Sequence, residues 1–218
     1  DMMVKRTNPA VRFYTIGDFK YSKENVDVVR RILLENHINV VINQWGLPYV
    51  PCKVLNEAKE GMAVKTIAIY HNSPDTNARI KDVEIALSET HNPLKKAMLY
   101  AKMFAFTQIT SRSMKYVYQH TDLYMVLSSS FVKKFKEFTG ITHPSHLQVL
   151  TNPVTIDSSS YDYSLSKKQK EIIYMGRIDF NQKRVYRVVD TWAKLEPVFP
   201  DWKLTIVGDG TARKDIEK

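Results

Sequence analysis

Most of the chain alternates between short apolar runs and stretches with helical periodicity, and this alternation constrains the fold more than any other feature. The apolar runs predict strands at 11–16, 38–42, 65–70, 123–127, 147–150, 171–175 and 203–207. Between them the apolar spacing predicts helices at 22–33, 50–58, 93–118, 131–138 and 185–195. Repeated strand–helix units with short connections are typical of parallel sheets covered by helices. The sequence therefore predicts an α/β protein with Rossmann-like, doubly wound parallel sheets.

The alternation is interrupted once, after the fifth expected strand. Asn152-Pro153-Val154 breaks the pattern, and the segment that follows is rich in Ser, Tyr and Lys without an apolar period. We interpret 154–170 as a linker between a first domain at 1–153 and a second domain that begins at 171–218. A chain of 218 residues, 44% of them hydrophobic, can bury one large core or two small ones.

The start of the second domain carries the clearest chemical signal. The strand at 171–175 ends in Gly176-Arg177, and a short polar loop then brings Lys183 to the start of the next helix. Positive side chains at the carboxyl end of a strand and the amino end of a helix favour an anion, because backbone N–H groups and the helix dipole favour one there too. The next strand ends in the turn Gly208-Asp-Gly210, which completes a βαβ unit. This pattern predicts a phosphate site, most plausibly for a nucleotide; the alternative is ordinary surface charge.

Two segments of this unit, MGRIDFNQKR and PDWKLTIVGDG, resemble the C-terminal domain of family 4 glycosyltransferases with the GT-B fold. The resemblance implies a retaining enzyme that moves a hexose from a nucleotide diphosphate sugar to a saccharide or lipid-linked saccharide acceptor, in polysaccharide or lipopolysaccharide biosynthesis. It implies that Arg177 and Lys183 contact the donor diphosphate. The donor-binding residues expected from it are Gly176, Arg177, Lys183, Gly208, Asp209 and Gly210.

The same resemblance covers nearly all of this chain but only about half of such an enzyme. It implies that the first strand, its Gly-rich loop and most of the C-terminal domain are missing, including an acidic motif that holds the donor. We therefore expect the 218-residue chain to be inactive by itself, and its second sheet to be poorly supported.

Polar residues follow two strands of the first domain. His71 and Asn72 come directly after the strand at 65–70, and Asn43 and Trp45 follow the strand at 38–42. A histidine at a strand end can bind a sugar hydroxyl or move a proton, and the resemblance implies that His71 touches the donor sugar. The alternative for His71 is a loop histidine that caps a backbone group. Asn43, Trp45 and Asn72 are second-tier candidates for the acceptor side, with a packing tryptophan as the alternative for Trp45.

Charge and cysteine content limit the partners and the compartment. The net charge is +9, which suits a phosphorylated ligand or an anionic membrane surface, although a solvated basic face explains most lysines. No nucleic-acid module is visible. With Cys52 as the single cysteine, no disulfide can form within the chain, and we expect a cytoplasmic protein, with peripheral attachment to the inner face of the membrane as one option. The histidines show no ligand spacing with Cys52, so we expect no metal and no cofactor besides the sugar nucleotide.

The expected helix at 93–118 is apolar on more than one side in its first half. Core packing is the commoner meaning of its main stripe, formed by Leu94, Ala97, Met98, Ala101, Phe104 and Ala105. The alternative is an interfacial helix that touches lipid through Tyr100, Met103 and Phe106, beside three lysines.

Two other functions remain open at this point. A GT-B nucleotide-sugar epimerase would need an acid/base pair near the anomeric carbon, and none is visible in this portion of the sequence. A non-catalytic basic module would bind a membrane or polyanion with an affinity that falls with salt and does not depend on Arg177.

Overall fold

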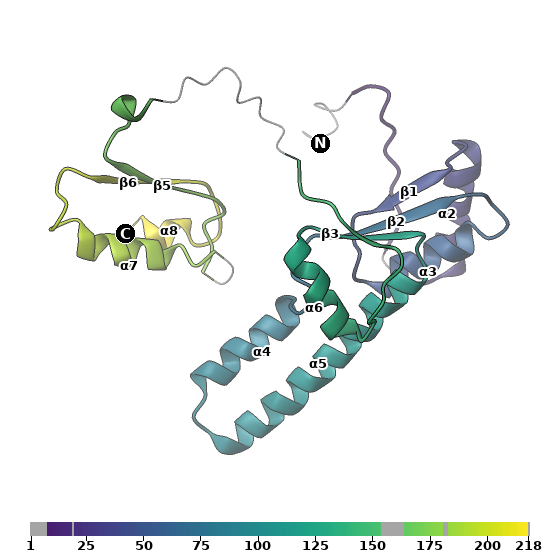
Figure 1. Ribbon diagram of the computed structural model, residues 1–218, viewed down its shortest axis with the longest axis horizontal. Coiled ribbons are helices and arrows are strands. Elements are labelled where there is room, and N and C mark those ends of the chain that lie inside the picture. The colour runs from purple at the N-terminus through teal and green to yellow at the C-terminus, as the bar shows by residue number, and fades with distance from the viewer. Residues whose placement is uncertain (1–7, 19, 154–163, 181–182, 218) are drawn as a thin grey trace. The chain divides into compact units, whose positions relative to one another are not determined.

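The computed structural model describes residues 8–18, 20–153, 164–180 and 183–217. The chain divides into two compact units, Asp1–Pro153 and Val154–Lys218 (Figure 1). Most of the expected linker at 154–170 lies outside the described residues, because these resume at Ser164.

The first unit contains one parallel sheet. Its strands pair in the order β1-β2-β3-β4, and they are Val40–Asn43, Lys65–Tyr70, Leu123–Val126 and Leu147–Val149. The expected α/β class with parallel sheets is confirmed. Within the described strands, however, the order follows the chain and does not reverse as in a doubly wound sheet. Right-handed crossovers that all step in one direction place their helices on one face.

Among the described residues of this unit, five helices accompany the sheet, and most begin or end at residues that the sequence marks. They are α2 (Lys23–Glu35), α3 (Tyr49–Ala58), α4 (Ala78–Glu89), α5 (Pro93–Gln119) and α6 (Ser129–Thr139). The Ser22 hydroxyl accepts a hydrogen bond from the Asn25 N–H at the start of α2, as expected for a cap. Gly140 ends α6 in the left-handed conformation, with a φ of 73°.

The main core lies between the sheet and three of these helices. Ala68, Tyr124 and Val126 point from neighbouring strands toward α3, α5 and α6, where they meet the buried Met114 and Phe135. Alternate residues of a strand point to opposite faces, so Val40 and Ile42 point to the other face of the sheet. They are 49% and 54% exposed.

Two expectations for the first unit were wrong. Residues 11–16 do not form a strand; Val11, Phe13, Tyr14 and Ile16 are all exposed, because an apolar alternation makes a strand only where a partner strand pairs with it. Helix α4 was missed altogether. It begins at Asn77, whose side chain accepts a hydrogen bond from the Ile80 N–H.

The core interpretation of the stripe on α5 was also wrong. Leu94, Met98 and Phe104 are 78%, 73% and 67% exposed, and Ala97, Ala101 and Ala105 are exposed as well. Met103 and Phe106, the alternative lipid contacts, are half-buried. Helices α4 and α5 form a hairpin that extends away from the sheet of its own unit (Figure 1). The side of α5 that packs against α4 is the side that is buried.

The second unit is a single βαβ motif with a short final helix. It comprises a 3₁₀ turn (Leu165–Lys167), parallel strands β5 (Glu171–Met175) and β6 (Lys203–Val207), and helices α7 (Tyr186–Leu195) and α8 (Arg213–Ile216). Its fully buried apolar side chains among the described residues are Ile178, Val185 and Ala212. Ile173 and Met175, on the outer face of β5, are 58% and 77% exposed. Two strands leave one face of this sheet open, as the sequence led us to expect.

Candidate functional site

The loop between β5 and α7 is organised by the carboxylate of Asp179. Its Oδ1 accepts a hydrogen bond from the Lys183 backbone N–H at 2.9 Å, and its Oδ2 lies 3.5 Å from Nε of Arg177. The Asp179 side chain is 14% exposed, whereas that of Arg177 is 62% exposed. One half-buried carboxylate therefore holds the backbone of one expected phosphate ligand and the side chain of the other, at the carboxyl end of β5. The sequence does not point to Asp179, because nothing in it shows these contacts.

The turn after β6 packs directly on this loop. The Ile178 N–H donates to the Asp209 carbonyl at 2.9 Å. A Cβ on Gly208 would lie 1.9 Å from the Gly176 carbonyl oxygen, and a Cβ on Gly210 would lie 2.2 Å from that of Ile178. Glycine is therefore required at both positions for the two loops to touch. All six expected donor-binding residues lie in these two adjoining loops, at the carboxyl edge of the two-stranded sheet.

The charge of these two loops favours a small anion. Arg177, Lys183 and Arg184 supply three positive charges against the two negative charges of Asp179 and Asp209, so one positive charge is in excess. Helix α7 starts immediately after, and its N-cap residue provides no side-chain hydrogen bond. The N–H groups of Arg187 and Val188 already donate to the carbonyls of Arg184 and Val185, so the helix contributes its dipole and not these two donors. The arrangement can bind phosphate groups by side-chain charge, to which the helix dipole adds.

A second group of expected residues lies at the carboxyl edge of the first sheet. The parallel pairing of Asn43 with Ala68 brings the ends of β1 and β2 together, and Nε2 of His71 lies 2.6 Å from Oε1 of Gln44. His71 thus pairs with a side chain of the neighbouring loop, and both residues are exposed. Asn72 is exposed beside it.

Trp45 is 53% exposed, so its ring is not a core residue. The loop that carries it is nevertheless fixed. The Trp45 N–H donates to Oδ1 of Asn43 at 2.9 Å, and the Gly46 N–H donates to the Ile69 carbonyl at 3.0 Å. The buried Tyr124 hydroxyl donates to the Gly46 carbonyl at 2.5 Å, and burial raises the pKa of this phenol well above its usual value. An exposed indole on an anchored loop is suited to stacking against a sugar ring.

A third polar cluster ties the loop after His71 to α6. Nζ of Lys134 lies 2.9 Å from Oδ2 of Asp75 and donates to the Ser73 hydroxyl at 3.0 Å, and that hydroxyl donates to Oδ1 of Asp75 at 2.5 Å. Burial alone would raise the pKa of Asp75, but the hydrogen bonds from Ser73 and Lys134 outweigh it and lower the pKa. The cluster was not anticipated, because Lys134 and Asp75 are far apart in the sequence and neither belongs to a motif.

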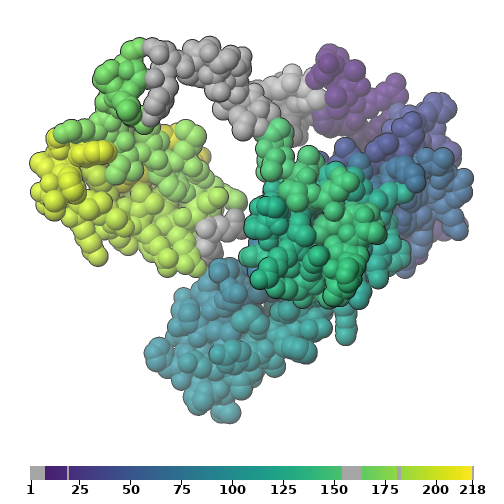
Figure 2. Space-filling view, in the orientation of Figure 1, coloured from purple at the N-terminus to yellow at the C-terminus, as the bar shows by residue number. Residues whose placement is uncertain are grey.

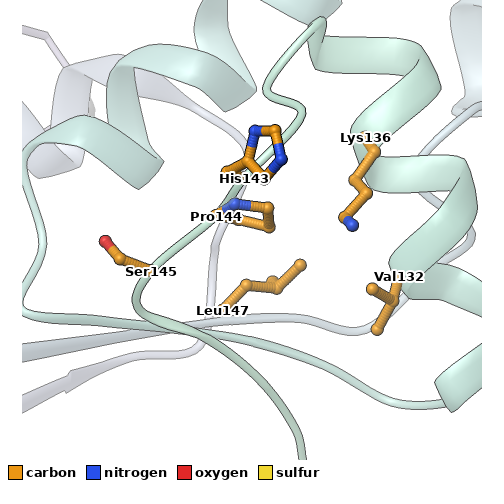
Figure 3. Close-up of a pocket in the computed structure, with 6 residues that line it drawn as sticks. All are labelled: Val132, Lys136, His143, Pro144, Ser145 and Leu147. Atoms are coloured by element: carbon orange, nitrogen blue, oxygen red, sulfur yellow. The ribbon is translucent and has the colours of Figure 1, made fainter.

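The described surface also contains an open depression of about 420 Å³ between α6 and the start of β4 (Figure 3). It is lined by Val132, Lys136, His143, Pro144, Ser145 and Leu147. Leu147 is the first residue of β4, so the depression lies at the amino edge of the sheet, opposite the edge of His71. None of the expected site residues lines it.

The described part of the chain contains no group of three or more His, Cys, Asp or Glu side chains placed to hold a metal ion. Among the described helices, none combines the length and the apolar character that crossing a bilayer requires.

The chain matches known proteins in structure and not in sequence. No protein-family model matches the chain, and no curated protein matches it in sequence. Among solved structures, the chain is similar to the apo form of the lipopolysaccharide outer core galactosyltransferase WaaB, with a TM-score of 0.51 and 17% identity. The match covers 89% of this chain and 43% of that one, so the chain spans less than half of the length of that protein. The likeness shows that the chain has a GT-B-like α/β fold.

Proposed function

We propose that this chain is the acceptor-side domain and the first part of the nucleotide-sugar-binding domain of a retaining, family 4 type glycosyltransferase. The enzyme moves a hexose from a nucleotide diphosphate sugar to a saccharide or lipid-linked saccharide, in polysaccharide or lipopolysaccharide assembly. The observation that carries the proposal is the pair of adjoining loops in which Asp179 positions Arg177 and Lys183 beside the Gly208-Asp209-Gly210 turn. The likeness to a lipopolysaccharide galactosyltransferase supports the same reading.

The chemistry proposed for these loops is charge stabilisation. As the glycosidic bond to the donor breaks, negative charge develops on the leaving diphosphate, and fixed cations there lower the barrier. Arg177 supplies a guanidinium that can hold two phosphate oxygens at once, and Lys183 supplies a compact ammonium. In this proposal, the two side chains carry out the neutralisation, and no protein nucleophile is assigned.

The residues of the first unit take roles in binding the sugars. His71, held by Gln44 at 2.6 Å, orients the donor sugar. Asn43, Trp45 and Asn72 contact the acceptor. The protein works on the cytoplasmic side, and a lipid-linked acceptor would bring it to the inner face of the membrane.

The donor site is tested by calorimetric titration of nucleoside diphosphates and their hexose derivatives against the 218-residue chain. Arg177→Ala and Lys183→Ala should each weaken diphosphate binding about tenfold, since each removes a charge-assisted contact. Lys194→Ala, a lysine in the last turn of α7, is the matched control and should bind as the parent does. Equal affinities in all four proteins would contradict the proposal.

The role of His71 has a separate readout. His71→Ala should weaken binding of the sugar nucleotide while leaving the affinity for the bare nucleoside diphosphate unchanged, because the histidine is assigned to the sugar. If both ligands lost affinity equally, His71 would support the structure of the site and would not contact the sugar.

A further inference from the structure

The first half of α5 presents a broad apolar face to solvent. Leu94, Met98 and Phe104 are 78%, 73% and 67% exposed, and Tyr100 and Ile109 are 62% and 57% exposed. On a helical projection Leu94, Met98 and Phe104 share one side with Ala97, Ala101 and Ala105, which are exposed too, while Tyr100 and Ile109 lie at the two borders of this face. Large contiguous apolar patches of this kind mark interaction sites on folded proteins.

Within the described part of the first unit, the helix that packs on α5 does not cover this face. Helix α4 packs on the other side of α5, where Leu99, Met103 and Phe106 are half-buried and Thr110 is buried. The hydroxyl of Thr110 accepts a hydrogen bond from Nδ2 of Asn77, directly before α4, at 2.8 Å. Among the described residues, α4 therefore covers one side of α5 and the apolar face on the other side is exposed. Figure 2 shows the hairpin extending from the body of the first unit.

The charge of α5 identifies the partner. Its 27 residues contain Lys95, Lys96, Lys102, Arg112 and Lys115, and they contain no Asp or Glu. Lys95 and Lys102 are seven residues apart, so they lie on the same side of the helix, along the border of the apolar face. Within the described residues, no carboxylate forms an ion pair with Lys95, Lys96 or Lys102. An apolar face bordered by unpaired lysines is complementary to a surface that offers both hydrocarbon and negative charge.

We infer that the apolar face of α5 docks on an anionic lipid bilayer, with Leu94, Met98 and Phe104 among the acyl chains and the bordering lysines at the phosphate level. The helix would lie in the plane of the interface and not across the bilayer. A second copy of the chain is a poorer partner, because two such faces would bring ten positive charges together without a carboxylate between them. The inference stands independently of the proposed glycosyl transfer.

Vesicle co-sedimentation tests the docking surface with the whole chain. The parent should bind vesicles of phosphatidylcholine with about one quarter phosphatidylglycerol, and bind vesicles of phosphatidylcholine alone at least tenfold more weakly, since the lysines act on the surface potential. The triple variant Lys95→Gln, Lys96→Gln, Lys102→Gln should bind the anionic vesicles on the order of a hundredfold more weakly, at about fivefold per lysine. Met98→Ser with Phe104→Ser should weaken binding about tenfold or more.

Matched controls separate this surface from the general positive charge. Lys23→Gln, Lys133→Gln and Lys194→Gln remove the same total charge from exposed positions of α2, α6 and α7. Leu165→Ser removes an apolar side chain that is 73% exposed but lies in the second unit. Both controls should keep most of the parent's affinity. Equal losses in the controls and the α5 variants would overturn the inference.

The single cysteine allows a more local measurement. Cys52 is buried and accepts a hydrogen bond from Nδ2 of Asn56 at 3.3 Å, and burial raises its pKa to about 11, so it reacts slowly with thiol reagents at neutral pH. Met98→Cys can then be labelled selectively with a polarity-sensitive fluorophore. Anionic vesicles should shift its emission to the blue, and they should leave a label at Leu165→Cys unchanged.

Two results would overturn the inference in this experiment. One is a label at position 98 that does not respond to anionic vesicles. The other is a protein that is dimeric without lipid and becomes monomeric on Met98→Ser with Phe104→Ser, because the face would then bind a second copy.

Discussion

Asp179 illustrates how much of the candidate donor site depends on one side chain. Its carboxylate joins the Lys183 N–H at 2.9 Å to the Arg177 guanidinium at 3.5 Å. It lowers the net positive charge of the loop, but it also holds the Arg177 guanidinium and the backbone from which the Lys183 side chain extends. A site built in this way gains geometric precision in return for some of its electrostatic attraction.

Gly208 is the residue at which the two donor loops come closest. In Gly208→Ala the new Cβ would lie 1.9 Å from the Gly176 carbonyl oxygen, so the turn after β6 must move away from the loop after β5. We expect the free energy of unfolding of the second unit to fall by about 2–4 kcal/mol, measured by hydrogen exchange of the β6 amides. Gly17→Ala is the control, because a Cβ there meets nothing within 4 Å. Unchanged exchange in Gly208→Ala would show that the loops do not pack as described.

Asp122 gives the first unit a pH-dependent contribution to stability. Its carboxylate accepts hydrogen bonds from Nζ of Lys65 at 2.9 Å and from the Thr66 N–H at 2.8 Å, and Nζ of Lys59 lies 3.6 Å away. The hydrogen bond from Lys65 is the largest cause that lowers the pKa of Asp122; burial opposes it, and Thr66 adds to it. Because the folded pKa lies below the unfolded value of about 3.9, the contribution is complete above that pH and is lost as the pH falls toward the folded pKa.

Asp122→Asn should therefore destabilise the protein at neutral pH more than in acid. The side chain is 34% exposed, so solvent screening limits the effect to about 1–2 kcal/mol at neutral pH. Urea unfolding of parent and variant at neutral pH and at about pH 3 measures the difference, which should shrink in acid. If parent and variant differed equally in free energy of unfolding at both pH values, the charge of Asp122 would not be the source of the difference.

The candidate site residues were predicted from the sequence because they follow the ends of predicted strands, and the reason that this works is geometric. In a parallel sheet the residues after neighbouring strands meet at one edge, so Asn43 and His71 could be placed together from their positions alone. The contacts of Lys134 with Asp75 and of Asp179 with Arg177 could not, because they depend on how loops return to helices. Nothing local distinguishes such a lysine or aspartate from a solvated one.

Among the helices, α4 was the hardest to predict and depends most on a single cap. Asn77 Oδ1 accepts from the Ile80 N–H at 3.0 Å, while its Nδ2 donates to the Thr110 hydroxyl of α5 at 2.8 Å. Asn77→Ala should lower the free energy of unfolding by about 1 kcal/mol or more, since it removes both contacts. Asn77→Asp keeps the cap oxygen and should lose less.

Hydrogen exchange of Ile80 and Val83, both buried in α4, distinguishes the two variants. If Asp and Ala at position 77 raise the exchange rates equally, the tie to Thr110, and not the cap, is the main contribution.

Helix α5 shows why periodicity alone could not assign its faces. One side carries Leu94, Met98 and Phe104, the other carries Leu99, Met103 and Phe106, and each has the spacing of a buried stripe. Packing of α4 against the second side leaves the first exposed. The helix itself was predicted almost to the residue, because Asn92, Pro93 and a long apolar period mark it clearly.

At the scale of the whole molecule, the two units differ in how well they can stand alone. The clusters of the first unit include Tyr124, Phe135 and Leu33 and draw on no residue beyond Leu147. The fully buried apolar cluster of the second comprises three residues among those described. The repeated β–α pattern predicted the α/β class in both. It could not reveal that residues 11–16 lack a partner strand, because pairing is a property of the assembled sheet.

Residues 1–153, produced alone, should therefore fold with a melting temperature within a few degrees of the corresponding transition of the full chain. Residues 164–218 alone should melt at a much lower temperature than residues 1–153, since so small a core offsets the conformational entropy of the segment by only a narrow margin. Differential scanning calorimetry of the three proteins makes the comparison. A large fall in the melting temperature of 1–153 would mean that the second unit stabilises the first.

The strand order β1-β2-β3-β4 also affects how this chain can be synthesised. Among the four described strands of this sheet, each pairs with the one made just before it, so none of them must wait for a segment beyond the next strand to leave the ribosome. The sheet can grow at one side during translation, with each crossover helix settling before the next strand arrives. An order of assembly that matches the order of synthesis leaves little time for an unpaired strand to meet another nascent chain.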